Sequence, residues 1–416
     1  MLTASTTGRT TRTVAARAAL VLVNALYIPL IAALLGAIQY GLYAAALASA
    51  MVFLSLSLAG SNWRLAVDIA HAPDDSKHLA GRFFAVRLVT AIPAAICLIV
   101  WGWLTGGDDT PHLLVPVLAV MIILRSLAAI FAAVLIGRGH SDIAMNSELA
   151  GRIGEVILAT AGIYLLALGP VWVACAVAVN WGAQLLFLGC RARPIRFPER
   201  LTPSLSQVLA TSWPYAVLGT LLTFMSQAPL VLAPETLSPV HALGWIGLAV
   251  SVLTAGLSLV GSFMASLAQP IARSARHGSA FVIYVYLSGM ALSILAGILA
   301  YTTIDMFGRR PIEAVLGHDY LGFIELAAPV GCLVASLLGL NIAANILGYY
   351  EKVALASLSV AVGAIITPLI LQIIGGPASA TKILYAVSAG ATISVLLLGL
   401  LFAVRHIASR QYSTPS

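Results

Sequence analysis

Long apolar stretches, separated by short polar segments, follow one another along the whole chain. Each stretch has about 20 or more residues, the length that an α-helix needs to cross the ~30 Å hydrocarbon core of a bilayer. The pattern predicts about twelve transmembrane helices, over residues 14–36, 41–62, 84–105, 112–136, 143–168, 170–190, 206–232, 241–268, 279–302, 322–346, 353–375 and 381–404. The fifth and sixth are separated only by a tight turn at Gly169-Pro170.

The apolar stretches do not alternate with polar residues at a period of two, which excludes a β-barrel. Composition agrees, because 60% of residues are hydrophobic, 9% are charged and the mean hydropathy is +1.00, whereas a soluble domain carries about 25% charged residues. The predicted fold class is therefore an all-α polytopic membrane protein. No cleavable signal peptide is predicted before the first apolar stretch.

No segment predicts a catalytic or metal centre. The chain lacks a glycine-rich phosphate loop with its lysine, a His/Glu metal-binding pair and a nucleophile elbow. Its four cysteines, Cys97, Cys175, Cys190 and Cys332, lie in or at the ends of apolar stretches without metal-binding spacing. We therefore expect no enzyme activity, no cofactor and no metal.

Basic residues are distributed unequally between the two sides of the predicted helices. If the N-terminus is cytoplasmic, eighteen lie on the inner side: Arg9, Arg12, Arg17, Arg64, Lys77, Arg82, Arg87, Arg138, Arg152, Arg191, Arg193, Arg196, Arg200, Arg273, Arg276, Lys352, Arg405 and Arg410. Three lie outside (Arg309, Arg310 and Lys382). This bias predicts that both termini are cytoplasmic. It also explains the net charge of +7, so nucleic-acid binding is not expected.

The predicted helices divide into two halves, residues 1–200 and 201–416. The segment 191–200 between them is charged and contains two prolines, as linkers often do. The second predicted helix ends in Leu-Ser-Leu-Ala-Gly-Ser at 56–61 and the eighth in Leu-Ser-Leu-Val-Gly-Ser at 257–262. We therefore expect two six-helix bundles, related by a parallel repeat, around a central cavity.

Arg125 lies near the middle of the apolar stretch 112–136, with no carboxylate close by in sequence. An arginine at that depth costs several kcal/mol unless it faces a partner, water or a ligand. Ala128, Ala129 and Ala132 share its helix face, which is typical of a helix turned towards a bundle interior. Arg125 is therefore a candidate cavity residue. The alternative is an arginine that is paired to a neighbouring helix for assembly only.

Three charged residues share one face of the fifth predicted helix. Glu148 and Arg152 are four residues apart and are predicted to form a structural ion pair. Glu155 lies deeper in the same helix. It is interpreted either as a cavity residue or as a counter-charge to Arg125.

Five other polar residues are candidates for the cavity or for helix assembly. Asn341 and Asn345 lie one turn apart on the tenth predicted helix, and Asn24 lies on the first. Either a cavity position or hydrogen bonds between helices explains them. Arg64 and Arg87 flank the inner loop between the second and third helices. They are placed either to meet an entering phosphate or only to fix the topology.

Several segments resemble one transporter family. The turn that ends in Tyr40-Gly41-Leu42-Tyr43 resembles the first-to-second helix turn of bacterial polysaccharide flippases, the Wzx-like (O-antigen) exporters of the multidrug/oligosaccharidyl-lipid/polysaccharide (MOP) superfamily. The segments 60–70, 135–140, 148–155 and 269–273 also resemble that family. One departure is Ser226-Gln227 in the seventh predicted helix, where such proteins often carry an acidic residue.

The resemblance implies a cavity that opens alternately to the cytoplasm and the periplasm. Its cargo would be a polyprenyl-pyrophosphate-linked oligosaccharide for surface polysaccharide or lipopolysaccharide biosynthesis, moved across the bacterial cytoplasmic (inner) membrane. Membrane lipid is a further partner, and glycosyltransferases and a polysaccharide polymerase are expected beside the exporter, which we expect to be a monomer. Arg125 suits the anionic cargo.

Two alternatives remain open from the sequence. A MATE-like multidrug antiporter would be favoured by a buried acidic pair and an aromatic cavity. A membrane-embedded polysaccharide polymerase or ligase would need a sizeable outer loop with several Arg and His residues, and the stretch 305–319 is short for that role.

The charge bias makes a direct prediction about topology. Reporter fusions at Ser416 should report a cytoplasmic position, and fusions near Asp109 a periplasmic one, because basic loops stay inside. A periplasmic C-terminus would exclude an even number of transmembrane helices.

Overall fold

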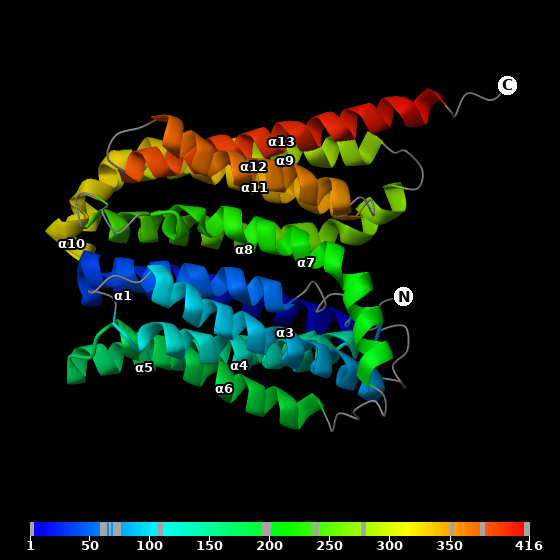
Figure 1. Cartoon of the computed structure of the whole chain (residues 1–416), viewed down its shortest axis with the longest axis horizontal. Coiled ribbons are helices and arrows are strands. Elements are labelled where there is room, and N and C mark those ends of the chain that lie inside the picture. Colours follow the sequence, from blue (N-terminus) through cyan, green and yellow to red (C-terminus); the bar gives the residue numbers. More distant parts are fainter. Residues whose placement is uncertain are drawn as a thin grey trace. The chain divides into compact units, whose positions relative to one another are not determined.

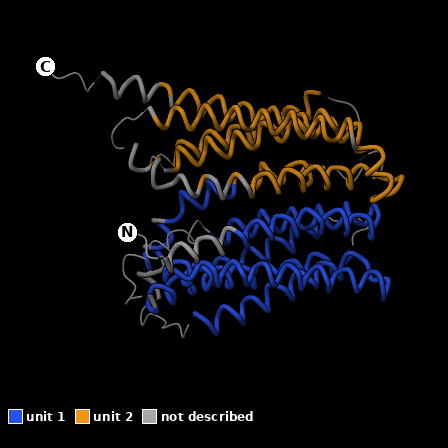
Figure 2. The backbone as a smooth tube through the Cα atoms, turned by 180° about the vertical axis from the view of Figure 1, so that it is seen from behind, with its two compact units in different colours: residues 1–220 blue, residues 221–416 orange. Residues whose placement is uncertain are grey.

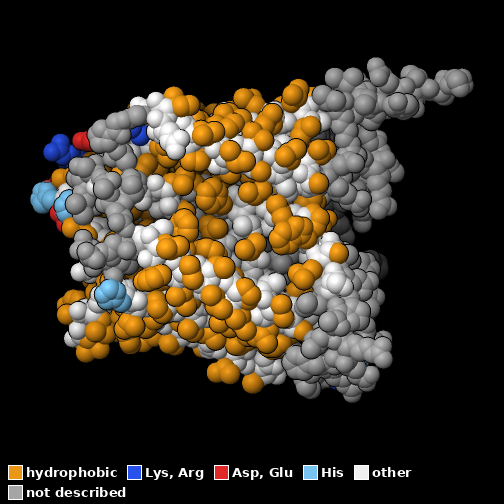
Figure 3. All heavy atoms as spheres, viewed as in Figure 1, with side chains coloured by type: hydrophobic (Ala, Val, Ile, Leu, Met, Phe, Trp, Pro, Cys, Tyr) orange, Lys and Arg blue, Asp and Glu red, His pale blue; other side chains and the backbone are white. Residues whose placement is uncertain are grey.

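The computed structural model describes residues 4–58, 65, 68–69, 76–105, 111–192, 201–233, 237, 241–275, 280–349, 353–374 and 379–411. All regular structure in these residues is helical, as predicted. Nine helices in this part of the chain are long and apolar enough to cross a membrane. Large apolar side chains such as Trp103 and Ile373, each 83% exposed, point away from the helix packing. On the face drawn in Figure 3, hydrophobic side chains cover the sides of the helices. The chain is a multi-pass membrane protein.

The chain forms two compact units, residues 1–220 and 221–416 (Figure 2). Unit 1 holds α1 (Ala4–Leu58), α3 (Ser76–Thr105), α4 (Leu114–Gly137), α5 (Ser141–Leu166), α6 (Pro170–Ala192) and most of α7 (Leu201–Val231). The unit boundary lies within α7, beyond residue 200 where we expected it. The reason is packing, since Val208 and Leu209 of α7 contact the apolar core of unit 1.

The helix α1 covers both of the first two predicted transmembrane segments. A straight helix over its apolar part, 44 residues long, would measure about 66 Å, roughly twice the hydrocarbon thickness. Gly36 interrupts it with φ 73° and ψ 165°, a conformation open almost only to glycine. Gly36 is the residue at which the two merged helices of α1 meet. Figure 1 shows α1 turning back on itself, so α1 is a helical hairpin.

An apolar core joins the other helices of unit 1. Phe83 and Val86 of α3, Ile130 and Val134 of α4 and Leu188 of α6 are all nearly inaccessible. Within this unit α4 packs against both α3 and α6, while α5 packs against α1 and α6. Because α5 touches α1 on one side and α6 on the other, its polar residues can reach both neighbours.

Unit 2 contains the remaining helices. These are α8 (Ala242–Ala275), α9 (Ala280–Phe307), α10 (Arg309–Leu316), the 3-10 segment η2 (His318–Leu326), α11 (Ala327–Tyr349), α12 (Val353–Ile374) and α13 (Ala380–Gln411). Small residues bring these helices close together, as expected in a membrane. A Cβ on Gly297 of α9 would lie 2.5 Å from the carbonyl oxygen of Gly331 on α11. The stretch 303–321, between two of the predicted transmembrane helices, contains the end of α9, all of α10 and the start of η2.

The Gly36 turn can be tested by substitution. Gly36→Ala should lower the free energy of unfolding by about 1 to 3 kcal/mol, because a Cβ disfavours this backbone conformation. Thermal unfolding of the purified protein in detergent measures the loss. Gly219→Ala is the matched control, since a Cβ there meets nothing within 4 Å, and alanine favours a helix by about 1 kcal/mol. Equal stability of both variants would contradict the hairpin.

Candidate functional site

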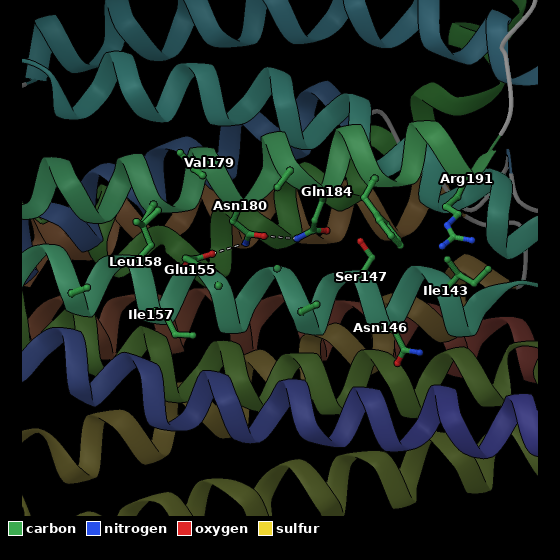
Figure 4. Close-up of a pocket in the computed structure, with 17 residues that line it drawn as sticks. Ile143, Asn146, Ser147, Glu155, Ile157, Leu158, Val179, Asn180, Gln184 and Arg191 are labelled. Atoms are coloured by element: carbon green, nitrogen blue, oxygen red, sulfur yellow. Dashed lines mark hydrogen bonds between the residues drawn. The ribbon is translucent and has the colours of Figure 1, made fainter.

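The buried carboxylate of Glu155 is the centre of a polar network between α5 and α6. Glu155 is 2% exposed. Arg152, one turn earlier on α5, donates from Nη1 to Glu155 Oε1 in an ion pair. Asn180 of α6 donates from Nδ2 to Glu155 Oε2 at 2.7 Å. Gln184 Nε2 in turn donates to Asn180 Oδ1 at 2.8 Å (Figure 4). Both carboxylate oxygens therefore have a partner, as a buried charge requires.

Local sequence explains why the network forms. Asn180 and Gln184 are four residues apart and share one face of α6. They face Gly151 of α5, where a Cβ would lie 2.2 Å from Asn180 Oδ1 and 2.6 Å from Gln184 Nε2. A Cβ at this position would force the two amides to move. Gly151 therefore lets the amides of Asn180 and Gln184 lie directly against α5.

Arg152 also reaches α1. Its guanidinium carbon lies 5.5 Å from the centre of the Tyr27 ring, within cation–π range. The Arg152 side chain is 30% exposed, whereas that of Glu155 is 1% exposed. Arg152 thus links α1 to the Glu155 network and supplies its positive charge.

Among the described residues, Arg125 of α4 forms no ion pair. Its Nη1 lies 3.1 Å from Met51 Sδ of α1, and its guanidinium carbon lies 4.7 Å from the centre of the Trp181 ring of α6. In the described part of the chain no carboxylate forms a salt bridge with it. Glu148 and Glu155 act on it only as more distant charges. Among the described residues, the contacts that hold the Arg125 guanidinium are therefore the Met51 sulfur atom and the face of the Trp181 ring.

The predicted ion pair between Glu148 and Arg152 is corrected by the structure, which pairs Arg152 with Glu155. Burial explains the choice. Glu155 is almost fully buried and needs a counter-charge, whereas Glu148 is only half-buried. Asn180 also fixes the Glu155 carboxylate in place from α6.

The other candidate residues lie apart from this network or outside the described residues. Arg87 is 1% exposed on α3, and Asn24 is half-buried on α1. Arg64 lies outside the described residues. Asn341 belongs to unit 2, where its Oδ1 accepts a bond of 2.9 Å from Asn345 Nδ2. Both asparagines lie on α11, so this bond is within one helix. One of the two predictions for them was hydrogen bonds between helices.

Sequence reasoning missed several residues that complete the site: Tyr27, Met51, Asn180, Trp181 and Gln184. One signal was available. Asn180 and Gln184 are two amides at helical spacing within an otherwise apolar stretch, which indicates hydrogen bonding between helices. No sequence pattern pairs Trp181 and Met51 with Arg125, because that contact joins three helices.

A groove of about 940 Å³ runs between α5 and α6 beside the network. Ile143 and Arg191 line one end (Figure 4). Its lining runs to Ala161 on α5 and to Ala176 on α6. The buried side chains of Glu155, Asn180 and Gln184 form part of its wall. In the described part of the chain no group of three or more His, Cys, Asp or Glu residues is arranged to hold a metal ion.

Comparisons with known proteins place this geometry in context. No protein-family model matches the chain, and no curated protein sequence matches it. Solved structures do match. A multidrug resistance MATE family transporter of the MOP superfamily, in an inward-facing conformation, superimposes with a TM-score of 0.69 at 13% identity, over 95% of this chain and 100% of that one.

The chain has the fold of MOP superfamily transporters. An outward-facing MATE family transporter matches with a TM-score of 0.68 at 14% identity, over 97% of each chain. The lipid II flippase MurJ matches with a TM-score of 0.64 at 12% identity, over 95% of this chain and 87% of that one. At such low identity the similarity defines the fold, which multidrug transporters and a lipid flippase share.

The Glu155 network predicts strong coupling between two residues. Glu155→Ala should lower the free energy of unfolding by about 2 to 3 kcal/mol, below the full cost of breaking a buried pair because Arg152 is partly exposed. The double variant Arg152→Ala/Glu155→Ala should lose less than the sum of the single losses. Thermal unfolding in detergent measures this cycle.

The exposed pair Glu313–His318, 3.4 Å apart, provides the control. Glu313→Ala should leave the unfolding temperature almost unchanged, since exposed ion pairs contribute little. Strictly additive losses at Arg152 and Glu155 would show that the two side chains do not depend on each other.

Proposed function

We propose that the chain is a flippase that moves a polyprenyl-pyrophosphate-linked oligosaccharide across the bacterial cytoplasmic membrane by alternating access, without catalysing a reaction. The shared fold of MATE transporters and the lipid II flippase MurJ supports a transporter of this type. The fold alone does not tell whether the cargo is an organic cation or an anionic lipid. We therefore infer the cargo from the charge of the site.

The observation that carries the proposal is the environment of Arg125. A charged residue at membrane depth costs about 2.5 to 3.5 kcal/mol, and here no salt bridge offsets that cost within the described part of the chain. Met51 and Trp181 hold the guanidinium in place, and Glu148 and Glu155 act on its charge only from a greater distance. A planar guanidinium binds phosphate through two parallel hydrogen bonds. A pyrophosphate group on the cargo is the chemical partner that this arrangement suits.

A MATE-like multidrug antiporter is the second candidate, because a buried carboxylate and aromatic rings lie in the same unit. Glu155 is buried, and Tyr27 and Trp181 flank the two arginines. However, Arg152 already neutralises Glu155, and Asn180 occupies its second oxygen. An organic cation would have to displace Arg152 and would also meet the positive charge of Arg125.

The topology that accompanies this proposal has twelve transmembrane segments with both termini in the cytoplasm. The α1 hairpin supplies two of them, and α7 and α8 each supply one. Glycosyltransferases would build the cargo on the inner side, and a polymerase would consume it on the outer side. Asn24, Arg64, Arg87 and Asn341 stay candidate contacts along the path, and neither a cofactor nor a metal is required.

The test is substitution of Arg125 in cells that depend on this exporter. Arg125→Ala should reduce export of lipid-linked oligosaccharide roughly ten- to hundredfold, the equivalent of about 1.5 to 3 kcal/mol for hydrogen bonds to a charged group. Arg125→Lys should retain part of the activity, because the charge remains but the planar fork is lost. Surface glycan and the amount of polyprenyl-linked oligosaccharide in the membrane are the measurements.

Arg310→Gln is the matched control, because it removes the same charge from an exposed residue on α10. Its export should equal that of the unmodified protein. Membrane-inserted protein is quantified for every variant, so a folding defect is recognised. Normal surface glycan in correctly inserted Arg125→Ala would refute a role for Arg125 in binding the cargo.

A further inference from the structure

The groove between α5 and α6 is open, and most of its exposed lining is apolar. Ile157, Val179 and Phe187 line it and are 64%, 57% and 45% exposed. Small residues on both walls, such as Gly154 and Ala183, leave it unfilled, and a Cβ on Gly154 would meet nothing within 4 Å. The groove therefore belongs to the surface that the described part of the chain leaves uncovered. In a membrane, hydrocarbon fills such a surface.

The length of the groove indicates how long a single hydrocarbon chain must be to fill it. From Ile143 to Ala161 its α5 wall spans nineteen residues, and the eighteen steps between them are about 27 Å of helix. This is nearly the whole hydrocarbon thickness of ~30 Å, whereas the acyl chain of a phospholipid covers only its own leaflet, about half as much. A chain that fills the groove must be longer than an ordinary acyl chain.

The polar wall of the groove does not oppose such a chain. Glu155, Asn180 and Gln184 are each less than a tenth exposed. Their hydrogen bonds are directed to Arg152 and to one another. The network thus satisfies itself within the protein (Figure 4), and hydrocarbon can pass beside it.

Charge marks one end of the groove. Arg191, in the last turn of α6, lines the groove and stacks on Phe187, with its guanidinium carbon 5.5 Å from the ring centre. Within the described residues it forms no ion pair with a carboxylate. This end therefore suits an anionic headgroup at the membrane surface.

We propose that the α5–α6 groove holds the isoprenoid tail of a polyprenyl phosphate, with the phosphate at Arg191. The assignment rests on the proposed function, since the lipid would be the carrier of the cargo. It gives the tail a path of its own. The tail stays in a mostly apolar groove, in which the charge of Glu155 is paired with Arg152, while the polar headgroup passes the arginines inside unit 1.

The experiment uses the full-length protein in phosphatidylcholine nanodiscs with a long-chain polyprenyl monophosphate that carries a photoreactive group on its tail. Cross-linked peptides, identified by mass spectrometry, should come from residues 143–161 and 176–191. Ala183→Trp should reduce this labelling to background, because the indole fills the groove. Ala291→Trp is the matched control on the exposed surface of α9 and should label normally.

A second variant guards against a folding defect. Gly154→Leu also fills the groove, and it should favour the helix. It should abolish labelling while the protein remains monodisperse. Undiminished groove labelling in both filled variants would overturn the inference.

The headgroup contact is tested separately. Arg191→Gln should weaken labelling about fivefold, as expected for one basic residue near a membrane surface. Excess phosphatidylglycerol, which is anionic but has shorter tails, should compete poorly. Equal competition by phosphatidylglycerol, or label spread over all exposed helices, would overturn the assignment to a polyprenyl chain.

Groove labelling tests this inference and export tests the proposed function, and the two measurements can fail separately. Arg125→Ala should lose export but keep groove labelling, because Arg125 is not among the residues that line the groove. Export of lipid-linked oligosaccharide with label outside the groove would overturn this inference and leave the proposed function intact. Groove labelling in a protein that exports no such cargo would overturn the proposed function instead.

Discussion

A carboxylate buried in a membrane helix needs a partner for each of its oxygens, and the arrangement of unit 1 follows from how Glu155 obtains them. Arg152 neutralises one oxygen from the same helix, and Asn180 binds the other from α6. The amides of α6 can lie against α5 in their present positions because residue 151 is glycine. The cost of an unpaired buried charge therefore favours the contact between Glu155 on α5 and Asn180 on α6.

This pairing also decides the electrostatic character of the site. Since Arg152 is committed to Glu155, that pair contributes little net charge. Arg125 is left with Trp181 and Met51, which orient its guanidinium without neutralising it. A guanidinium without a direct ion pair is the basis on which we propose an anionic cargo rather than an organic cation. The two proposed roles are complementary, because the site would bind an anionic headgroup and the groove would accept a long apolar tail.

The helices were predictable because length and hydropathy alone define a membrane helix. The stretch 353–375 corresponds to α12 (Val353–Ile374), and 170–190 corresponds to α6 (Pro170–Ala192). Polar ends were harder to predict. The helix α3 begins at Ser76, before the predicted 84, because its first turns are polar and hydropathy does not detect them.

The contacts of the site were less predictable than its helices. Helical spacing correctly placed Glu148, Arg152 and Glu155 on α5. It predicted Glu148 as the ion-pair partner of Arg152, whereas the partner in the structure is Glu155. The choice depends on burial and on Asn180 of another helix, and neither is encoded in local spacing. In the same way, the central position of Arg125 was evident from sequence, while its contacts with α1 and α6 required the fold.

The central claim is that the interior of unit 1 serves an anionic lipid-linked cargo, and cells that lack this protein test it most directly. They should accumulate polyprenyl-linked oligosaccharide on the cytoplasmic leaflet and lose surface polymer, with unchanged sensitivity to cationic dyes. Increased sensitivity to ethidium-like compounds, with intact surface polysaccharide and no trapped intermediate, would contradict the account. That result would show that Glu155, rather than Arg125, sets the sign of the interior.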